Sequence, residues 1–324
     1  MLIVDLRSRY LGLELDNPFV PSSTPLSKNL DSARQLEDAG ASALVMHSLF
    51  QEEIEAGSAE TPGAQAGGDL FGGAHNLASK ELYLEQFKLL HKALGIPVIP
   101  SLNGTSPGTW VEYAGELVAA GAPALELNVY YVAADINEAA AAVEQRVLSL
   151  VETLLHQVEV PIGVKLSPYF SSLGNLVSAL QARGVAGIAL FNRFYQPNVD
   201  LDTLSVSDAL ELSTSSDALL AMRWMAILHG RVNMTLAATG GIHFAEDALK
   251  MLLCGADVTY LGGTLLANGP EQLSRIRDNT VRWLQQRKYE SLTQIRGRLS
   301  QANYPDPTAF ARGHYLRMLG DYKV

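Results

Sequence analysis

Short apolar runs alternate with longer segments of helical periodicity along most of the chain. The runs occupy residues 19–23, 43–48, 97–103, 124–129, 162–167, 187–192, 234–239 and 258–263. Each run is nearly continuous in apolar residues and lacks the alternation expected of a strand with one solvated face. Such runs are typical of parallel strands that are buried on both faces. The pattern therefore predicts eight strands of a parallel sheet covered by helices.

The segments between the runs carry the period of amphipathic helices. Four of them end in glycine, as a helix capped before a following strand does, at residues 30–40, 109–121, 173–184 and 244–255. Eight strand–helix units with right-handed crossovers close most simply into a barrel. We predict a (β/α)8 TIM barrel of the α/β class, at about residues 17–285, in a single domain of residues 1–324. A doubly wound sheet is the alternative, although the first strand lacks the glycine-rich turn of dinucleotide folds.

Several segments lie outside this repeat. Residues 4–18 have the pattern of a small hairpin under the barrel, residues 273–289 that of a closing helix, and the tail 299–324 has no predicted place. Two connections are long, at residues 49–96 and 193–233, and parts of them are rich in Gly, Ala, Ser, Asp and Pro. We expect them to form loop excursions at one barrel face, suited to a lid or an oligomer contact. A homodimer is the expected assembly.

Composition and charge exclude several classes of protein. With 48% hydrophobic and 18% charged residues and a mean hydropathy of +0.08, the chain has the composition of a globular protein. The net charge of -10 repels a nucleic-acid backbone. Cys254 is the single cysteine, so a disulfide framework and a cysteine-bound cluster are excluded, and the histidines lack metal-ligand spacing. We expect no metal, no membrane span and no signal peptide, and therefore a cytoplasmic protein.

Polar residues stand at the carboxyl end of almost every predicted strand. They are Ser22, Ser23, His47, Ser48, Asn103, Asn128, Lys165, Asn192 and Thr239. In an α/β barrel these ends converge on one mouth, where the active site lies. A single polar strand end is ordinary, but the convergence of several amides with one lysine predicts a ligand site.

Two glycine pairs and the lysine indicate the kind of ligand. Gly240 and Gly241 follow the seventh strand, and Gly262 and Gly263 follow the eighth. Barrels that bind phosphate usually do so with these two loops, because glycine lets backbone N–H groups approach the anion. Lys165 can stabilise negative charge on a reduced flavin, or it can form a Schiff base with a carbonyl substrate. These two uses of the lysine imply different enzymes.

Taken together, these segments resemble the flavin-dependent dihydroorotate dehydrogenases. The matching segments are residues 17–23, 40–48, 124–128, 164–170, 190–192, 239–257, 261–270 and 287–297, so the likeness covers about residues 1–298. Membrane-bound members of that family carry an N-terminal helical extension. Here the first strand begins by residue 19, which implies the soluble class 1 type.

The resemblance implies a barrel that holds FMN. It places the phosphate on Gly240, Gly241, Gly262 and Gly263, the isoalloxazine against Lys165 and Asn128, and Ser22, Ser23 and Ser48 beside the flavin. Asn103 lines the same mouth and is counted with the cofactor-binding residues, and Asn192 is expected to touch the flavin or the substrate.

The chain departs from the family at the substrate side. Where the family has a cysteine or serine base and a second asparagine, this chain has Tyr131 and Ala133. The family's lysine after the second strand falls at His47, and Arg193 follows the strand-six asparagine. Of the substrate-binding asparagines in the second-strand excursion, only Asn76 offers a counterpart.

These departures leave the proton-transfer group open. Tyr131 and His47 are rival candidates for the base, and Lys165 is the third catalytic candidate. A tyrosine has an ordinary pKa near 10 and needs a neighbouring cation to act as a base, whereas a histidine titrates near neutrality. Packing of the tyrosine over the flavin and a neutral histidine bonded to the flavin are the alternatives.

The leading hypothesis is an FMN-dependent oxidoreductase of the dihydroorotate dehydrogenase type. It would transfer a hydride between a CH–CH bond of a small, pyrimidine-like substrate and flavin N5, with weak or absent activity on dihydroorotate itself. A separate electron acceptor, either a small molecule or a redox protein, is required because the chain carries no cluster-binding cysteines. The alternatives are a phosphosugar lyase that uses Lys165 in a Schiff base, and a non-catalytic flavin-binding partner of a redox complex.

Overall fold

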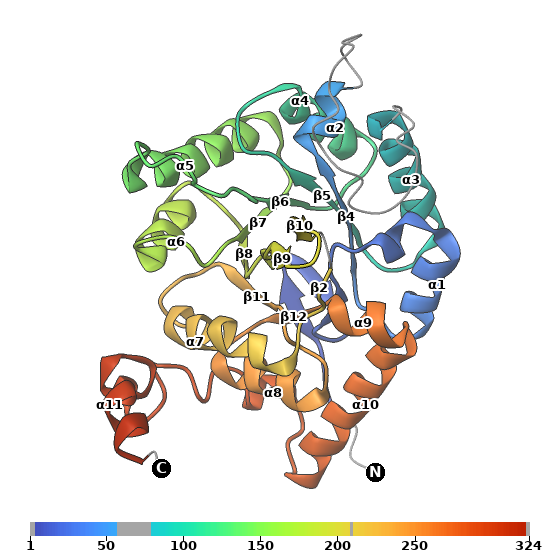
Figure 1. Cartoon of the computed structure of the whole chain (residues 1–324). Coiled ribbons are helices and arrows are strands. Elements are labelled where there is room, and N and C mark those ends of the chain that lie inside the picture. The colour runs from blue at the N-terminus through green and yellow to red at the C-terminus, as the bar shows by residue number, and fades with distance from the viewer. Residues whose placement is uncertain (1–3, 57–78, 208–209, 322–324) are drawn as a thin grey trace.

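Eight parallel strands form the centre of the computed structural model, which describes residues 4–56, 79–207 and 210–321 (Figure 1). They are β3 (Phe19–Pro21), β4 (Leu44–Phe50), β5 (Val98–Asn103), β6 (Leu125–Asn128), β7 (Ile162–Leu166), β8 (Gly187–Leu190), β11 (Thr235–Thr239) and β12 (Val258–Leu261). Their order is β3-β12-β11-β8-β7-β6-β5-β4. The Ser42 N–H donates to Phe19 O at 3.2 Å and brings β4 beside β3, which nearly closes the barrel. The predicted TIM barrel and its eight strands are confirmed.

Helices follow the strands and surround the sheet (Figure 1). They are α1 (Leu30–Asp38), α2 (Gln51–Ala56), α3 (Ser79–Ala93), α4 (Thr109–Ala119), α5 (Ala140–Gln157), α6 (Leu173–Ala182), α7 (Ala218–Leu228), α8 (Ala245–Cys254), α9 (Gly263–Asn268) and α10 (Glu271–Gln286). Short 3-10 turns occur at η1 (Pro25–Lys28), η2 (Ser215–Asp217), η3 (Leu292–Gln294) and η4 (Pro307–Phe310). The predicted glycine ending is seen at α8, where Gly255 has φ +116° and caps the helix.

Two separate apolar cores hold the barrel together. The outer core lies between strands and helices, and α6 contributes Leu173, Leu176 and Leu180 to it. The inner core fills the barrel and consists of the alternate strand residues, among them Val20, Val45, Ile99, Ala189, Ala237 and Val258. Because both faces of each strand are covered by apolar side chains, the strands read as continuous apolar runs in the sequence.

A hairpin closes the amino-terminal end of the barrel, as the sequence predicts. Strands β1 (Ser8–Tyr10) and β2 (Leu13–Leu15) pair antiparallel, and the side chains of Tyr10 and Leu11 join the inner core. Gly163 and Gly187 leave room for the Leu11 side chain. A Cβ on Gly163 would lie 3.1 Å from a methyl group of Leu11, and a Cβ on Gly187 would lie 2.7 Å from it. The lower barrel is therefore filled, and the amides and the lysine of the predicted site lie toward the carboxyl ends of the strands.

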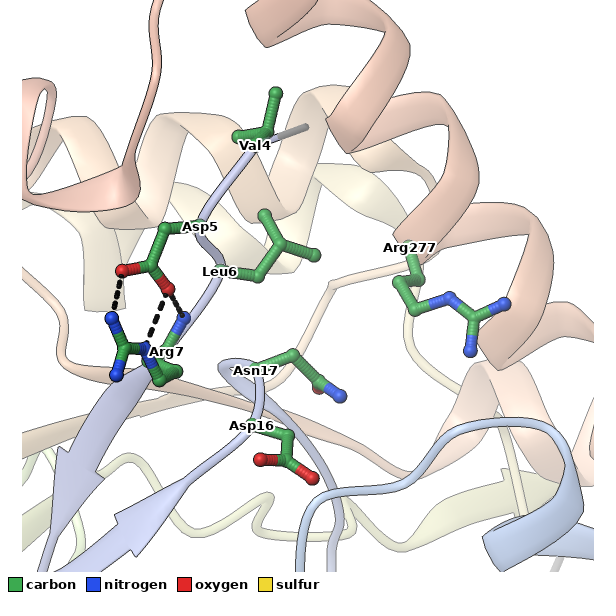
Figure 2. Close-up of a pocket in the computed structure, with 7 residues that line it drawn as sticks. All are labelled: Val4, Asp5, Leu6, Arg7, Asp16, Asn17 and Arg277. Carbon is green, nitrogen blue, oxygen red and sulfur yellow. Dashed lines mark hydrogen bonds and ion pairs between the residues drawn. The ribbon is translucent and has the colours of Figure 1, made fainter. Parts of the chain in front are cut away.

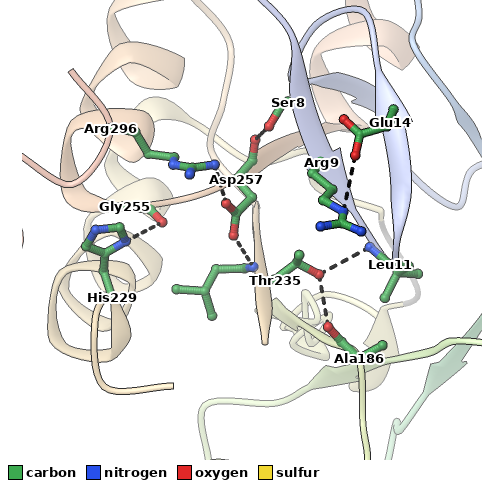
Figure 3. A network of polar contacts seen from close by, with 11 residues as sticks. Ser8, Arg9, Leu11, Glu14, Ala186, His229, Thr235, Gly255, Asp257 and Arg296 are labelled. Carbon is green, nitrogen blue, oxygen red and sulfur yellow. Dashed lines mark hydrogen bonds and ion pairs between the residues drawn. The ribbon is translucent and has the colours of Figure 1, made fainter. Parts of the chain in front are cut away.

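A partly buried aspartate ties the C-terminal segment to the base of the barrel (Figure 3). Asp257 accepts from the Leu236 N–H at 2.8 Å and from Arg296 Nη1 at 2.6 Å, and its carbonyl accepts from Ser8 Oγ at 2.5 Å. Burial raises the pKa of Asp257, while the Leu236 N–H and the Arg296 charge act in the opposite direction. This cluster joins the first hairpin, the sheet and the residues after α10.

The excursions and the tail lie outside the central pattern. Part of the second connection forms a hairpin of β9 (Asn198–Asp200) and β10 (Ser205–Ser207), whereas residues 57–78 of the first connection lie outside the described residues. The tail folds into η4 and α11 (Arg312–Asp321), and α11 projects away from the other helices (Figure 1). In the described parts of the chain, none of the helices has the length and apolar character needed to cross a membrane.

Candidate active site

Three predicted site residues form one row at the carboxyl ends of neighbouring strands. Asn103 is the register partner of Asn128, and Asn128 is the register partner of Lys165. Register partners in a parallel sheet present their side chains on the same face, about 4.8 Å apart, so the row is about 10 Å wide. All three residues are buried. The structure thus brings these three side chains together.

The row carries polar atoms that the protein does not satisfy. Asn103 Nδ2 and Asn128 Oδ1 are buried without a hydrogen-bond partner. The Lys165 ammonium group likewise makes no hydrogen bond or ion pair with any residue that the structure describes. Buried donors and acceptors are almost always paired in folded proteins, since each unpaired group costs about 1–3 kcal/mol. The row therefore fits a ligand that offers both donors and acceptors.

A chain of hydroxyl groups lies beside this row. Ser48 Oγ is 3.1 Å from Ser23 Oγ and 2.8 Å from Ser101 Oγ, and it accepts from Asn128 Nδ2 at 3.1 Å. Ser101 Oγ donates to Glu126 Oε1 at 3.1 Å. Ser23 and Ser48 were predicted, but Ser101 and Glu126 were not. Their positions two residues before Asn103 and Asn128 put them on the same strand face, and this period was the available signal.

A bulge in β4 decides which of two neighbouring residues enters the barrel. Val45 pairs with Ile99, but Ser48 rather than His47 pairs with Ser101, because the register shifts between Val45 and Ser48. Without that shift, His47 would share the interior face with Val45.

His47 instead lies among residues outside the row. Its Nδ1 is 3.3 Å from Ser27 Oγ, and its ring meets the Tyr83 ring edge-on, with centroids 4.9 Å apart. Burial, with a smaller effect of the Lys28 charge, lowers the pKa of His47 to about 4. The imidazole is therefore neutral at pH 7.

Tyr131 contacts a charged pair on the loop and helix that follow β6. Its hydroxyl donates to Glu138 Oε2 at 2.7 Å, and the Arg146 guanidinium lies 4.3 Å from the centre of its ring. Glu138 also forms an ion pair with Arg146. Sequence reasoning missed both charged residues, because their spacing from Tyr131 carries no recognisable motif.

Aromatic side chains from three loops gather above the strand ends. Tyr130, after β6, stacks on Phe194, after β8, with centroids 4.2 Å apart and an interplanar angle of 8°. Tyr169, after β7, meets the same phenylalanine edge-on at 5.3 Å. These flat surfaces are suited to a planar ligand.

Asn192 is partly committed to the backbone. Its Nδ2 donates to Val129 O at 2.9 Å and to Lys165 O at 3.3 Å, which joins the ends of β6 and β7. Arg193 turns away to Asp217, with an ion-pair distance of 3.3 Å. Only the amide oxygen of Asn192 is left for a ligand.

The four predicted glycines differ in what surrounds them. Gly240 has φ +88°, and a Cβ placed there would meet no atom within 4 Å, so open space lies beside it. At Gly241 a Cβ would lie 2.3 Å from Ala218 N, which leaves no room for any side chain. A Cβ on Gly262 or Gly263 would approach the hydroxyl groups of Ser22 and Ser213 at 2.6 Å and 2.9 Å.

Two further polar residues stand at this glycine-lined edge. Ser213 Oγ is 3.1 Å from His243 Nε2, and the carbonyl of His243 accepts from Gln272 Nε2 at 2.9 Å. Sequence reasoning treated His243 as one of several histidines without a role and did not consider Ser213. The contact depends on the fold of the second excursion, which no short motif predicts.

A hollow of about 480 Å³ lies at the other end of the barrel (Figure 2). It is lined by Val4, Asp5, Leu6, Arg7, Asp16, Asn17 and Arg277. Its cations already have partners, since Arg7 is 2.7 Å from Asp5 and Arg277 is 3.0 Å from Asp278. Among the described residues, no three His, Cys, Asp or Glu side chains are grouped to hold a metal ion. The polar mouth therefore remains the candidate site.

Comparison with known proteins identifies the family of the chain. The family model for dihydroorotate dehydrogenase matches residues 5–284. The chain belongs to the dihydroorotate dehydrogenase family. It is 28% identical over 297 residues to an Aeropyrum pernix protein with the provisional name dihydroorotate dehydrogenase A (fumarate), covering 88% of this chain and 94% of that one.

Two further relatives have the name dihydroorotate dehydrogenase B (NAD(+)), catalytic subunit. The Endomicrobium trichonymphae protein is 24% identical over 310 residues, covering 93% of this chain and 99% of the relative. The Bacillus cereus protein is 27% identical over 264 residues, covering 78% and 83%. Membership of this flavin-dependent family makes the chain an oxidoreductase that acts on a CH–CH group. A Schiff-base lyase and a non-catalytic flavin carrier are not favoured.

Proposed function

We propose that the chain binds FMN at the barrel mouth and moves a hydride between this flavin and a CH–CH bond of a small, pyrimidine-like molecule. The observation that carries the proposal is the row of Asn103, Asn128 and Lys165, with its unsatisfied buried atoms. An isoalloxazine presents ring nitrogens and carbonyl oxygens along one edge, so it can pair with donors and acceptors alternately. The width of about 10 Å suits a fused three-ring system.

The protein's part in hydride transfer is electrostatic. A bound flavin would supply the hydride acceptor at N5, and negative charge would then develop near its N1 and C2 carbonyl. Lys165 would hold its positive charge beside that region, in a buried position where the interaction is stronger than in water. Ser22, Ser23 and Ser48 would line the flavin on the side of β3 and β4. Asn192 would contact the flavin or the substrate through its free oxygen.

The phosphate would lie at the loops after β11 and β12. The open space beside Gly240 supports this placement, as do the first backbone N–H groups of α9, which have no partner within a helix. Gly241, Gly262 and Gly263 would let the loops fold closely around the anion.

The proton step requires a base near the substrate carbon. A neutral tyrosine can accept a proton from carbon only if it passes its own phenolic proton to another group. Tyr131 has such a group, because its hydroxyl already donates to Glu138 at 2.7 Å. We assign the base to Tyr131, with Glu138 receiving the phenolic proton. His47 is the weaker candidate, because its contacts are with Ser27 and Tyr83.

The substrate would differ from dihydroorotate in the groups that it presents. Ala133 removes an amide hydrogen-bonding group, and the Arg193 guanidinium is paired with Asp217. The stacked pair of Tyr130 and Phe194 offers a flat apolar surface instead. We expect a planar ring that resembles a pyrimidine, and weak or absent turnover of dihydroorotate. Asn76, the other candidate contact, lies outside the described residues.

The electrons would leave to a separate small molecule or redox protein, in the cytoplasm. We also propose a homodimer, for which the β9–β10 hairpin offers exposed apolar side chains at Val199, Leu201, Leu204 and Val206. Sedimentation equilibrium tests the assembly.

The direct test of the function is the visible spectrum of the purified protein. We expect flavin absorption bands, release of FMN on denaturation, and bleaching of the bands by a dihydropyrimidine under anaerobic conditions. The Lys165→Met variant should bind FMN, but its flavin should be reduced at least a hundredfold more slowly, because no cation compensates the negative charge of the reduced flavin. A protein that stays colourless after incubation with excess FMN contradicts the proposal.

A further inference from the structure

The hydrogen-bond chain beside the row has one acceptor at its inner end. Glu126 is 1% exposed, and its Oε1 accepts from Ser101 Oγ at 3.1 Å. Ser101 is the donor of this hydrogen bond, and a serine hydroxyl donates one hydrogen bond and can accept two. The hydrogen of Ser101 is therefore used by Glu126.

The hydrogen bond from Ser101 to Glu126 fixes the donor and the acceptor in each of the other hydrogen bonds of the chain. Because its hydrogen is committed to Glu126, Ser101 must accept from Ser48 at 2.8 Å. Ser48 has then used its own hydrogen, so it must accept from both Asn128 Nδ2 and Ser23 Oγ, each at 3.1 Å. The two acceptor positions of Ser48 are thereby filled.

We infer that Glu126 is a positioning residue that fixes which end of the Asn128 amide faces the cofactor. With Nδ2 held by Ser48, the Oδ1 of Asn128 is buried and has no partner among the described residues, so it is left for a ligand. Asn128 is thus an acceptor for an N–H group of the flavin ring. The inference rests on the proposed flavin site and adds to it two residues, Glu126 and Ser101, that touch neither cofactor nor substrate.

Two substitutions interrupt the chain at different points. In the Glu126→Leu variant, Ser101 loses its carboxylate, donates to Ser48 instead, and Ser48 then donates to the oxygen of Asn128. In the Ser101→Ala variant, Ser48 loses its acceptor and also turns its hydrogen to Asn128. In both variants the amide reverses and presents a donor where the flavin also presents one. The Glu126→Gln variant keeps an acceptor oxygen in the same place.

The experiment measures the affinity of each apo-protein for FMN by quenching of flavin fluorescence. We expect about a tenfold weaker dissociation constant for Glu126→Leu and Ser101→Ala, equal to about 1.4 kcal/mol, and less than a threefold change for Glu126→Gln. Ser42→Ala is the matched control. Ser42 is a buried serine whose hydroxyl bonds to Phe19 O at 3.2 Å and is not part of the chain, so its variant should match the wild type.

Repeating the substitutions in an Asn128→Ala background separates an effect of Glu126 on the Asn128 amide from a general effect of Glu126 on the fold. If Glu126 acts through the amide, Glu126→Leu has no further effect on FMN affinity there, although it still lowers the melting temperature. An equal loss of affinity in both backgrounds overturns the inference, and so does an affinity of Ser101→Ala equal to that of the control. Wild-type protein that binds no FMN overturns the flavin proposal itself, and this inference with it.

Discussion

Replacing His47 tests both the stability of the fold and the assignment of the base. In the folded chain the pKa of His47 is lowered from 6.5 to about 4, first by burial and second by the Lys28 charge. The imidazole contacts Ser27 Oγ through Nδ1, so His47→Asn keeps a polar group near that position and removes the titration. The variant therefore isolates the proton-linked part of the stability.

The sign and size of the effect follow from the two pKa values. Above pH 6.5 the histidine is neutral in both the folded and the unfolded state, so its titration does not change the free energy of unfolding with pH. As the pH falls from 6.5 to about 4, the unfolded chain takes up a proton that the folded chain refuses, so the unfolded state is favoured. The free energy of unfolding falls by about 1.4 kcal/mol per pH unit, and by about 3 kcal/mol in total.

Urea unfolding of wild type and His47→Asn at pH values from 8 to 4 measures this difference. We expect the wild type to lose about 3 kcal/mol relative to the variant across that range, since carboxylates titrate equally in both proteins. A difference that is constant with pH refutes the reasoning. Activity gives a second readout, because a His47 base would place the acid limb of kcat/KM near pH 4 and His47→Asn would abolish turnover.

The remaining predictions concern the other parts of the site and the base of the barrel. Gly240→Ala should weaken FMN binding at least tenfold and riboflavin binding much less, as measured by fluorescence, because the new methyl group enters the phosphate space at positive φ. Tyr131→Phe and Glu138→Gln should each lower kcat by about a hundredfold without changing FMN affinity. Arg296→Met should reduce the unfolding free energy by about 2 kcal/mol in urea, because Asp257 loses its ion pair.

The barrel was predictable because its physical cause is local. A strand covered by the inner core on one side and helices on the other must be apolar at nearly every position, and this leaves continuous runs such as residues 162–167. The chain must also reverse after each helix, which Gly255 permits with φ +116°. Both signals lie within a few residues of each other in the sequence.

Part of the site was not predictable because its cause is an irregularity. Because of the bulge in β4, Ser48 rather than His47 lies on the interior face. No residue type in that strand predicts the bulge. The residue that satisfies the backbone beside the bulge is distant in sequence. Where the ladder is interrupted, Tyr83 Oη accepts from the Ser101 N–H at 2.9 Å and donates to Ser101 O at 3.1 Å. A candidate list drawn from strand ends could therefore name both residues but could not separate them.

The difference between regular strands and irregular loops also bears on the proposal that this chain keeps the cofactor of its family and takes a different substrate. Below the row, the interior is filled by Tyr10 and Leu11 from the hairpin, so any change there costs packing energy. At the level of the row, Asn128 and Lys165 are fixed by register between hydrogen-bonded strands, and a change there would remove the proposed flavin contacts. Tyr131 stands on a loop beyond the strand ends, where its partner Glu138 comes from the same loop. The proposed base therefore stands on a loop outside the hydrogen-bonded strands, and Tyr131 and Ala133, two positions at which this chain departs from the family's pattern, both lie on that loop.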